Sequence, residues 1–214
     1  MQPSDLTEPG TAITSATFYF DPVCPWTWRT SRWLVDTAQR RGIDVSYRAF
    51  DLSDGKPLDE LPEQSRAAFA SGRRFLRCVA AAGADGRDDL IAGAYSLYGA
   101  RAFDEGIEPS PDLVEKCWRE VGGDAYVEAL DDDSWDATLA QSTERARELA
   151  GDDAGSPVTV VTTASAERAF FGPVVAPTPT GDSADRLWDL LTSAANAPEF
   201  FELKARRTAA PVDA

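Results

Sequence analysis

The stretch from residue 16 to residue 42 constrains the fold of this chain more than any other. Its first five residues are aromatic-rich and uncharged, and they predict a short buried strand. An Asp-Pro turn follows, then Cys24 and Pro25, and apolar residues recur at helical spacing from there to Gly42, which can end a helix. Because proline at the first helical position sacrifices no hydrogen bond, Cys24 is predicted to lie at the helix N-terminus.

Cys24 is therefore a candidate reactive cysteine. The positive end of the helix dipole favours the thiolate, which is the nucleophilic form, so we expect a pKa below the free-cysteine value of about 8.5. Position 27 is threonine, so no Cys-x-x-Cys disulfide can form within the motif. The Thr27 hydroxyl could donate a hydrogen bond to the thiolate. Two other interpretations stay open, namely a packing cysteine and an inactive site in which Thr27 is a neutral replacement.

The middle of the chain changes character from α/β to all-helical. Residues 43–52 alternate in polarity and predict a second strand, parallel to the first because a helix connects the two. Residues 61–150 contain no strand signal, which indicates a helical insertion. The helices that we expect in it span residues 63–82, 88–100, 111–118, 124–130 and 134–150.

Strand character returns after the helical block. Residues 158–162 predict a third strand that a proline, Pro157, opens, and residues 169–175 predict its antiparallel partner. Residues 182–195 predict a closing helix, and residues 198–207 are expected to add a final helical turn or two. The whole order is βαβ, helical block, ββα.

Composition excludes several classes of site. The chain has 214 residues, 43% of them hydrophobic, which fits one domain with an insertion. A net charge of −15 disfavours nucleic acid and anionic membranes as partners. The absence of histidine excludes Ser-His-Asp and Cys-His catalysis and imidazole metal sites. Cys78 and Cys117 complete an odd set of three without motif-like spacing, so we expect packing roles for both and no zinc site.

The termini and the hydropathy pattern indicate where the protein works. Residues 1–13 lack the basic and apolar regions of a signal peptide, and no apolar run reaches transmembrane length. We therefore expect a cytoplasmic protein with free thiols and no membrane partner. No Gly-rich phosphate loop or nucleotide fingerprint occurs, and the acidic clusters are expected to be solvated helix ends, so no metal is predicted.

Several segments together resemble a known family. FDPVCPWTW, SRWLVD, LPEQSR, AFFGPV, LWDLLT and FFELKARRT are similar to the actinobacterial mycothiol-dependent nitroreductases, within the DsbA-like class of thioredoxin folds. The match spans about residues 16 to 208. It implies a thioredoxin-like domain formed by residues 14–60 and 151–208, a helical insertion over 61–150, and flexible termini at 1–13 and 209–214.

The resemblance also implies roles for individual residues. The nucleophile of the family maps onto Cys24, its active-site tryptophan onto Trp26 and its cis-proline onto Pro157, while Thr27 replaces a second cysteine. Phe103 stands where relatives tend to carry a histidine. We expect Cys24 and Thr27 to be catalytic, and we expect substrate contacts from Pro25, Trp26, Trp28, Phe103, Ser156 and Pro157.

The function that follows is a thiol-dependent oxidoreductase with a monothiol mechanism. The resemblance implies mycothiol as the small-molecule thiol that reduces the enzyme, acting with an unidentified electron-accepting substrate. One alternative is a thiol-cofactor-dependent isomerase or transferase, which would convert its substrate without net loss of thiol. Another is a redox-inactive binding domain that keeps the groove beside Pro157.

Overall fold

The sheet of the molecule has the strand order of a thioredoxin fold. The computed structural model describes residues 11–60 and 62–211. Its sheet has the order β2-β1-β3-β4, in which β1 and β2 are parallel and β3 is antiparallel to both β1 and β4. The strands are β1 (Ile13–Phe20), β2 (Asp44–Ala49), β3 (Val158–Thr163) and β4 (Glu167–Phe171). The expected fold class is confirmed.

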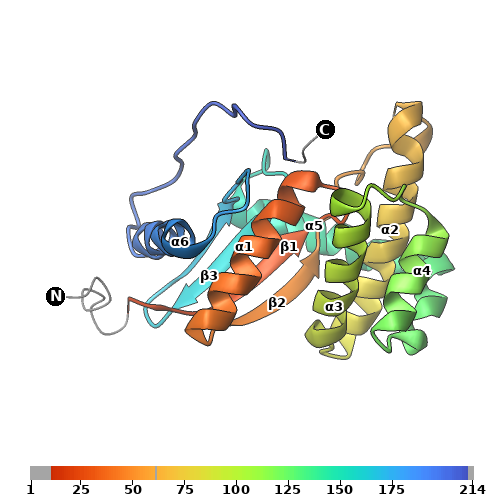
Figure 1. The fold of residues 1–214 in the computed structure, drawn as a ribbon, viewed down its shortest axis with the longest axis horizontal. Coiled ribbons are helices and arrows are strands. Elements are labelled where there is room, and N and C mark those ends of the chain that lie inside the picture. The colour runs from red at the N-terminus through yellow and green to blue at the C-terminus, as the bar shows by residue number, and fades with distance from the viewer. Residues whose placement is uncertain (1–10, 61, 212–214) are drawn as a thin grey trace.

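Helices cover both faces of the sheet (Figure 1). On one face lie α1 (Pro25–Arg41) and α6 (Gly181–Ala195), whose contact is made by the rings of Trp33 and Trp188, 6.1 Å apart between centroids. On the other face lies α5 (Asp136–Ala150). Alternate residues of β1 serve the two sides: Phe18 and Phe20 pack with α1, whereas Tyr19 packs with Ala146 of α5.

The insertion between β2 and β3 forms a helical layer at the β2 side of the sheet (Figure 1). This layer contains α2 (Glu63–Ala84), α3 (Asp88–Gly99) and α4 (Pro111–Glu120), while α5, the last helix of the insertion, covers a face of the sheet. The apolar spacing predicted all four helices. The expected fourth helix is a 3₁₀ segment, η4 (Asp124–Asp131), and short 3₁₀ turns occur at η2 (Leu58–Glu60) and η5 (Asp133–Trp135). A π-helical turn, η3 (Ala100–Asp104), extends α3 and was not expected.

The structure corrects the expected limits of three segments. Ile13, assigned to a flexible terminus, is the buried first residue of β1, while residues 1–10 lie outside the described part of the chain. β4 ends at Phe171 rather than at residue 175, because Pro173 has no N–H for the ladder. The helical turns expected over residues 198–207 reduce to one hydrogen-bonded turn from Ala197 to Phe200, after which residues 201–211 are irregular. Of the terminus 209–214 that was expected to be flexible, Pro211 accepts a hydrogen bond, and residues 212–214 lie outside the described part of the chain.

Two local expectations are confirmed. The peptide bond between Ser156 and Pro157 is cis, as the family resemblance implied. Helix α1 ends where predicted: Gly42 adopts φ 66°, and the N–H groups of Gly42 and Ile43 bond the carbonyls of Gln39 and Ala38. Among the helices that the structure describes, none is long and apolar enough to cross a membrane.

Candidate active site

Cys24 lies at the junction of β1 and α1. It is the N-cap residue of α1 with extended backbone, and its N–H donates to the Asp21 carbonyl at 3.2 Å. Pro25 occupies the first helical position, as the sequence predicted. The side chain is only 8% exposed, and its Sγ lies 3.5 Å from the carbonyl oxygen of Ser156, the residue that precedes the cis-proline. The structure therefore brings Cys24 and the Ser156–Pro157 turn together.

Hydrogen bonds of the Thr27 and Ser156 side chains hold Cys24 and the Ser156–Pro157 turn together. Thr27 is fully buried one turn into α1, and its Oγ1 lies 2.8 Å from Ser156 Oγ. The same Ser156 hydroxyl accepts a hydrogen bond from the Asp21 N–H at 2.8 Å. One serine side chain thus joins the end of β1, the start of α1 and the entrance of β3. The Ser156 side chain points into the protein, so its carbonyl, and not its hydroxyl, faces the sulfur.

The pKa of the Cys24 thiol is raised, which contradicts the expectation of a depressed value. Burial is the largest cause, because it penalises the thiolate, and the negative charge of Asp21 adds to it. The Thr27 hydroxyl and the N–H groups of Thr27 and Trp26 act in the opposite direction. The helix N-terminus does favour the thiolate, but desolvation outweighs it. In addition, the Ser156 carbonyl accepts a hydrogen bond from the neutral thiol.

Asp21 is a functional candidate that the sequence analysis did not single out. Its carboxyl is buried at the end of β1, where Oδ1 accepts from the Val23 N–H and Oδ2 from the Leu52 N–H, each at 2.8 Å. Burial raises its pKa to about 7, against the lowering effect of those hydrogen bonds. Its position directly after a buried aromatic strand, ahead of Cys24, was the available signal.

Trp26 and Trp28 have different surroundings. Trp26 is half-buried and lines a groove of about 620 Å³, where the guanidinium of Arg207 lies 4.8 Å from its ring centroid. Trp28 is 2% exposed and its Nε1 donates to Asp104 at 3.3 Å, so this side chain packs in the core and offers little surface to a substrate. The expected substrate contact of Trp28 therefore becomes a structural support of the site.

Phe103 contacts Trp28 instead of the cysteine in this arrangement. It belongs to the π-helical turn η3, is half-buried, and its ring centroid lies 6.3 Å from that of Trp28. Among the hydrogen bonds and ring contacts of the described residues, none joins Phe103 to Cys24. Phe103 is therefore connected to the site indirectly: it packs against Trp28, which lies one helical turn after Cys24.

Two glycines let the insertion approach the site closely. A Cβ at Gly72 of α2 would lie 2.7 Å from Cγ1 of Val23, and a Cβ at Gly99 of α3 would overlap the ring of Trp28. Side chains at either position would therefore push the helical layer away from α1 and the Cys24 loop. The absence of a side chain at both places positions the insertion against the active-site turn.

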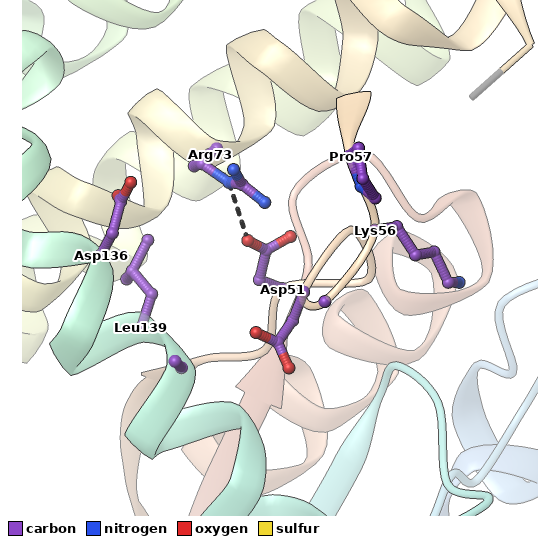
Figure 2. A pocket seen from close by; sticks show the side chains of 9 residues that line it. Asp51, Lys56, Pro57, Arg73, Asp136 and Leu139 are labelled. Carbon is purple, nitrogen blue, oxygen red and sulfur yellow. Dashed lines mark hydrogen bonds and ion pairs between the residues drawn. The ribbon is translucent and has the colours of Figure 1, made fainter. Parts of the chain in front are cut away.

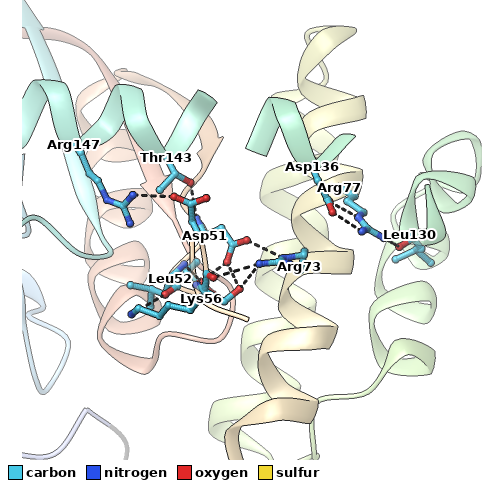
Figure 3. A network of polar contacts seen from close by, with 12 residues as sticks. Asp51, Leu52, Lys56, Arg73, Arg77, Leu130, Asp136, Thr143 and Arg147 are labelled. Atoms are coloured by element: carbon cyan, nitrogen blue, oxygen red, sulfur yellow. Dashed lines mark hydrogen bonds and ion pairs between the residues drawn. The ribbon is translucent and has the colours of Figure 1, made fainter. Parts of the chain in front are cut away.

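A polar network fixes the same loop from the other side (Figure 3). Directly after β2, the N–H of Asp51 donates to Thr143 Oγ1 at 2.9 Å, and its carboxylate accepts from Arg73 Nε at 3.0 Å. Arg73 also donates to Ser53 Oγ at 3.0 Å. The next residue, Leu52, bonds Asp21, so the network links α2 and α5 to the carboxyl beneath Cys24.

A second hollow, of about 360 Å³, lies beside this network (Figure 2). Its lining includes charged residues from the loop after β2, from α2 and from α5, and all of these except Lys56 form ion pairs. Asp51 pairs with Arg73, Asp54 with Arg147 at 2.9 Å, and Asp136 with a neighbouring arginine. In the part of the chain that the structure describes, no group of three or more potential ligand residues is arranged to hold a metal ion. The ion pairs around this hollow join the loop after β2 to helices α2 and α5 of the insertion.

The remaining cysteines lie away from solvent. Cys78 in α2 and Cys117 in α4 are fully buried and form no disulfide. The Cys78 thiol donates to the Tyr126 carbonyl at 3.2 Å. Burial raises the pKa of the Cys78 thiol to about 12 and also raises that of Cys117. Both observations fit the packing roles that their helical positions predicted.

Comparison with known proteins identifies one relative by sequence and several solved structures with a similar fold. The chain is 26% identical over 204 residues to the uncharacterized protein Rv2286c of Mycobacterium tuberculosis, covering 94% of this chain and 86% of that protein. A candidate protein disulfide isomerase from Nitrosomonas europaea is 11% identical with TM-score 0.58, covering 84% of this chain and 98% of the other. The cytosolic disulfide reductase DsbM from Pseudomonas aeruginosa is 17% identical with TM-score 0.55, covering 84% and 97%.

The two structural likenesses show a shared fold and, at that identity, no more. The sequence evidence is stronger, because a family profile matches residues 23–205, which include both Cys24 and the Ser156–Pro157 turn. The chain therefore belongs to the Rv2466c-like family, described as mycothiol-dependent nitroreductase Rv2466c.

Proposed function

We propose that this protein is a thiol-dependent oxidoreductase in which Cys24 works as a single nucleophilic cysteine and mycothiol is the reductant. The observation that carries the proposal is the position of Cys24, which caps α1 with its sulfur against the Ser156 carbonyl of the cis-proline turn. Membership of a family described as mycothiol-dependent supports the choice of thiol. The free state of all three cysteines supports a reducing compartment such as the cytoplasm.

The cycle needs two molecules of thiol. Cys24 and a first mycothiol together give two electrons and two protons to the acceptor, and the two sulfurs are left joined as a mixed disulfide. The thiolate of a second mycothiol attacks the mycothiol sulfur, the bond to Cys24 breaks, and the Cys24 thiolate takes up a proton. The net change is one acceptor reduced and two thiols converted to one symmetrical disulfide.

Thr27 and Ser156 have positioning roles in this cycle. The Thr27 hydroxyl lowers the pKa of Cys24 and, through its contact with Ser156, keeps the sulfur beside the cis-proline turn. Pro157 and Trp26 would flank the substrate at the nucleophile, with Pro25 starting the helix that directs its N–H groups there. Because position 27 has no sulfur, the mixed disulfide must be resolved by an external thiol.

Intact-mass analysis tests the proposal. After mild peroxide in the presence of mycothiol, we expect one mycothiol adduct on the wild-type protein, located at Cys24 by peptide mapping, and none on Cys24→Ser. The adduct should disappear on addition of fresh mycothiol. An unmodified Cys24, or a disulfide between Cys24 and Cys78 or Cys117, would overturn the monothiol cycle. Substrate conversion without loss of thiol would favour the isomerase alternative.

The variant Thr27→Cys adds a complementary arm to that experiment. A sulfur one turn after Cys24 allows an internal disulfide to form, which removes the adduct and lowers the dependence on external thiol. Threonine and cysteine have similar helix propensities, so the intrinsic cost to α1 is small. Persistence of the full adduct in this variant would mean that the two sulfurs cannot meet in this site.

A further inference from the structure

Exposed apolar side chains gather in one groove beside Trp26. Within the described part of the chain, the large apolar side chains with high exposure are Ile107, Phe171, Leu190, Phe201 and Leu203. All except Ile107 line the groove of about 620 Å³ that Trp26 also lines. Apolar side chains left in water in one place mark a binding surface, and this volume is of the size that small ligands occupy.

The groove shares Trp26 with the segment that carries Cys24. Trp26, on one wall, follows Cys24 by two residues, and Ala154, on another, precedes Ser156 by two residues. The sulfur of Cys24 and the carbonyl of Ser156 are 3.5 Å apart. Cys24, Ser156 and Pro157 themselves do not line the groove, so Trp26 is the residue that connects a molecule bound there to the nucleophile's motif.

The C-terminal segment 197–211, here called the strap, passes from α6 toward the start of α1 (Figure 1). Residues 200–209 of the strap line the groove. At its first end, Arg168 donates to the Phe200 carbonyl at 2.6 Å. At its other end, Arg207 lies over Trp26, and Arg29 donates to the Pro211 carbonyl at 2.7 Å. The part between these anchors is exposed, with Phe201 at 83%.

The strap also brings positive charge to an acidic protein. Lys204, Arg206 and Arg207 all line the groove, and among the ion pairs of the described residues none of the three has a carboxylate partner. Asp153 and Glu202 line it too, so the cations exceed the carboxylates by one in a chain whose net charge is −15. Unpaired cations beside apolar walls complement an anion with an apolar body.

We propose that this groove binds the electron acceptor, and that the acceptor is a flat apolar molecule carrying an acidic group. Its rings would lie against Phe171 and Phe201, where aromatic stacking adds to apolar burial, and its acidic group would meet Lys204 and Arg206. The assignment as acceptor rests on the proposed function of Cys24, whereas the binding site itself does not.

A pair of fluorescent probes tests the ligand chemistry. Anilinonaphthalene sulfonate has the flat apolar body and the acid, and N-phenylnaphthylamine has the same body without the acid. On Cys24→Ser protein we expect the sulfonate to bind at one site and to quench tryptophan fluorescence, with the neutral probe bound about fivefold more weakly, a difference in the range of one or two exposed ion pairs. Equal affinity, or no saturable binding, would overturn the proposal.

Matched variants locate the probe. Lys204→Gln with Arg206→Gln should lower sulfonate affinity to that of the neutral probe, and the control pair Lys116→Gln with Arg186→Gln, also minus two charges, should leave it unchanged. Phe201→Asp should weaken both probes about tenfold, because a charged and hydrated side chain replaces an apolar wall, and the carboxylate also repels the sulfonate. Ile107→Asp, at an exposed site that does not line the groove, should weaken neither. Phe201 is exposed, so loss of folding cannot explain weaker probe binding by the Phe201→Asp variant.

Turnover separates this proposal from the proposed function. With wild-type protein, the sulfonate should compete with the electron acceptor and not with mycothiol. Probe binding without any Cys24 adduct would support the groove as a binding site and refute the proposed thiol chemistry. A Cys24 adduct that forms normally, with no probe binding or with competition against mycothiol, would refute the acceptor site alone.

Discussion

At the scale of single residues, the site is governed by the environment of one sulfur. Cys24 has the helix N-terminus that lowers thiol pKa values in proteins, yet its pKa is raised because the side chain is buried and Asp21 lies nearby. A raised value means that the thiol form dominates at neutral pH in this state. Access of solvent or substrate to the sulfur therefore controls how much thiolate forms.

The pH dependence of Cys24 alkylation, followed by mass at that residue, tests this electrostatic account. We expect a midpoint above the free-cysteine value of about 8.5 in the wild-type protein. Asp21→Asn should move the midpoint down, because the carboxylate that opposes the thiolate is removed. Thr27→Val should move it up, because the hydroxyl that favours the thiolate is removed. A wild-type midpoint at or below about 8.5 would show that the helix dipole outweighs burial.

At the scale of elements, the contact between α3 and α1 depends on a residue without a side chain. Gly99 ends α3 where the ring of Trp28 crosses it, and the chain continues into the π-helical turn that carries Phe103. Gly83 in α2 is a matched case, since a Cβ there would meet nothing closer than Ile91 Cδ1 at 4.0 Å. Both glycines lie in the last turn of a helix, but only Gly99 is packed against another side chain closely enough to exclude a methyl group.

Two glycine-to-alanine variants are therefore expected to have opposite effects on the free energy of unfolding. Gly99→Ala should lower it by about 2 kcal/mol, because the new methyl overlaps Trp28. Gly83→Ala should raise it by roughly 0.5 kcal/mol, because alanine loses less backbone entropy in a helix. Urea denaturation measures both. A neutral Gly99→Ala would mean that α3 moves freely relative to α1.

At the scale of the whole molecule, one buried carboxyl couples stability to pH. Asp21 connects the end of β1 to Leu52 after β2, and the polar network at Asp51 and Arg73 extends that connection into the insertion. Its folded pKa of about 7 lies above the unfolded value of about 3.9. Between those values the unfolded chain has lost the proton and the folded protein keeps it, so the folded state loses relative stability as pH rises through this window.

Asp21→Asn should remove that dependence. The wild-type protein is expected to lose roughly 4 kcal/mol of unfolding free energy from this group as the pH rises from about 4 to about 7, with the loss complete above about 7. The variant, which cannot ionise, should show a flatter profile in urea denaturation across the same range. Asp152→Asn, at an exposed position, is the control and should keep the wild-type slope. Parallel profiles for Asp21→Asn and wild type would exclude Asp21 as the source.

Much of the site followed from local rules. Pro25 and the helical spacing after it were enough to place Cys24 at the N-cap of α1, and Gly42 was enough to end that helix, because caps depend on a few neighbouring residues. The alternation and aromatic content of β1, β2 and β3 predicted their places, and the family resemblance supplied the cis-proline. The order of these elements then restricted the chain to one topology.

The tertiary structure decided what depends on atoms distant in the sequence. The direction of the Cys24 pKa shift follows from burial beside Ser156, 132 residues away, and no helix-cap rule contains that information. The packing of Trp28 against Gly99 likewise depends on segments that meet in space. The same holds for the path of the strap, which contacts Arg29 and Trp26. Short-range patterns determine which elements form, whereas desolvation and docking are set by what covers each side chain once the whole chain has folded.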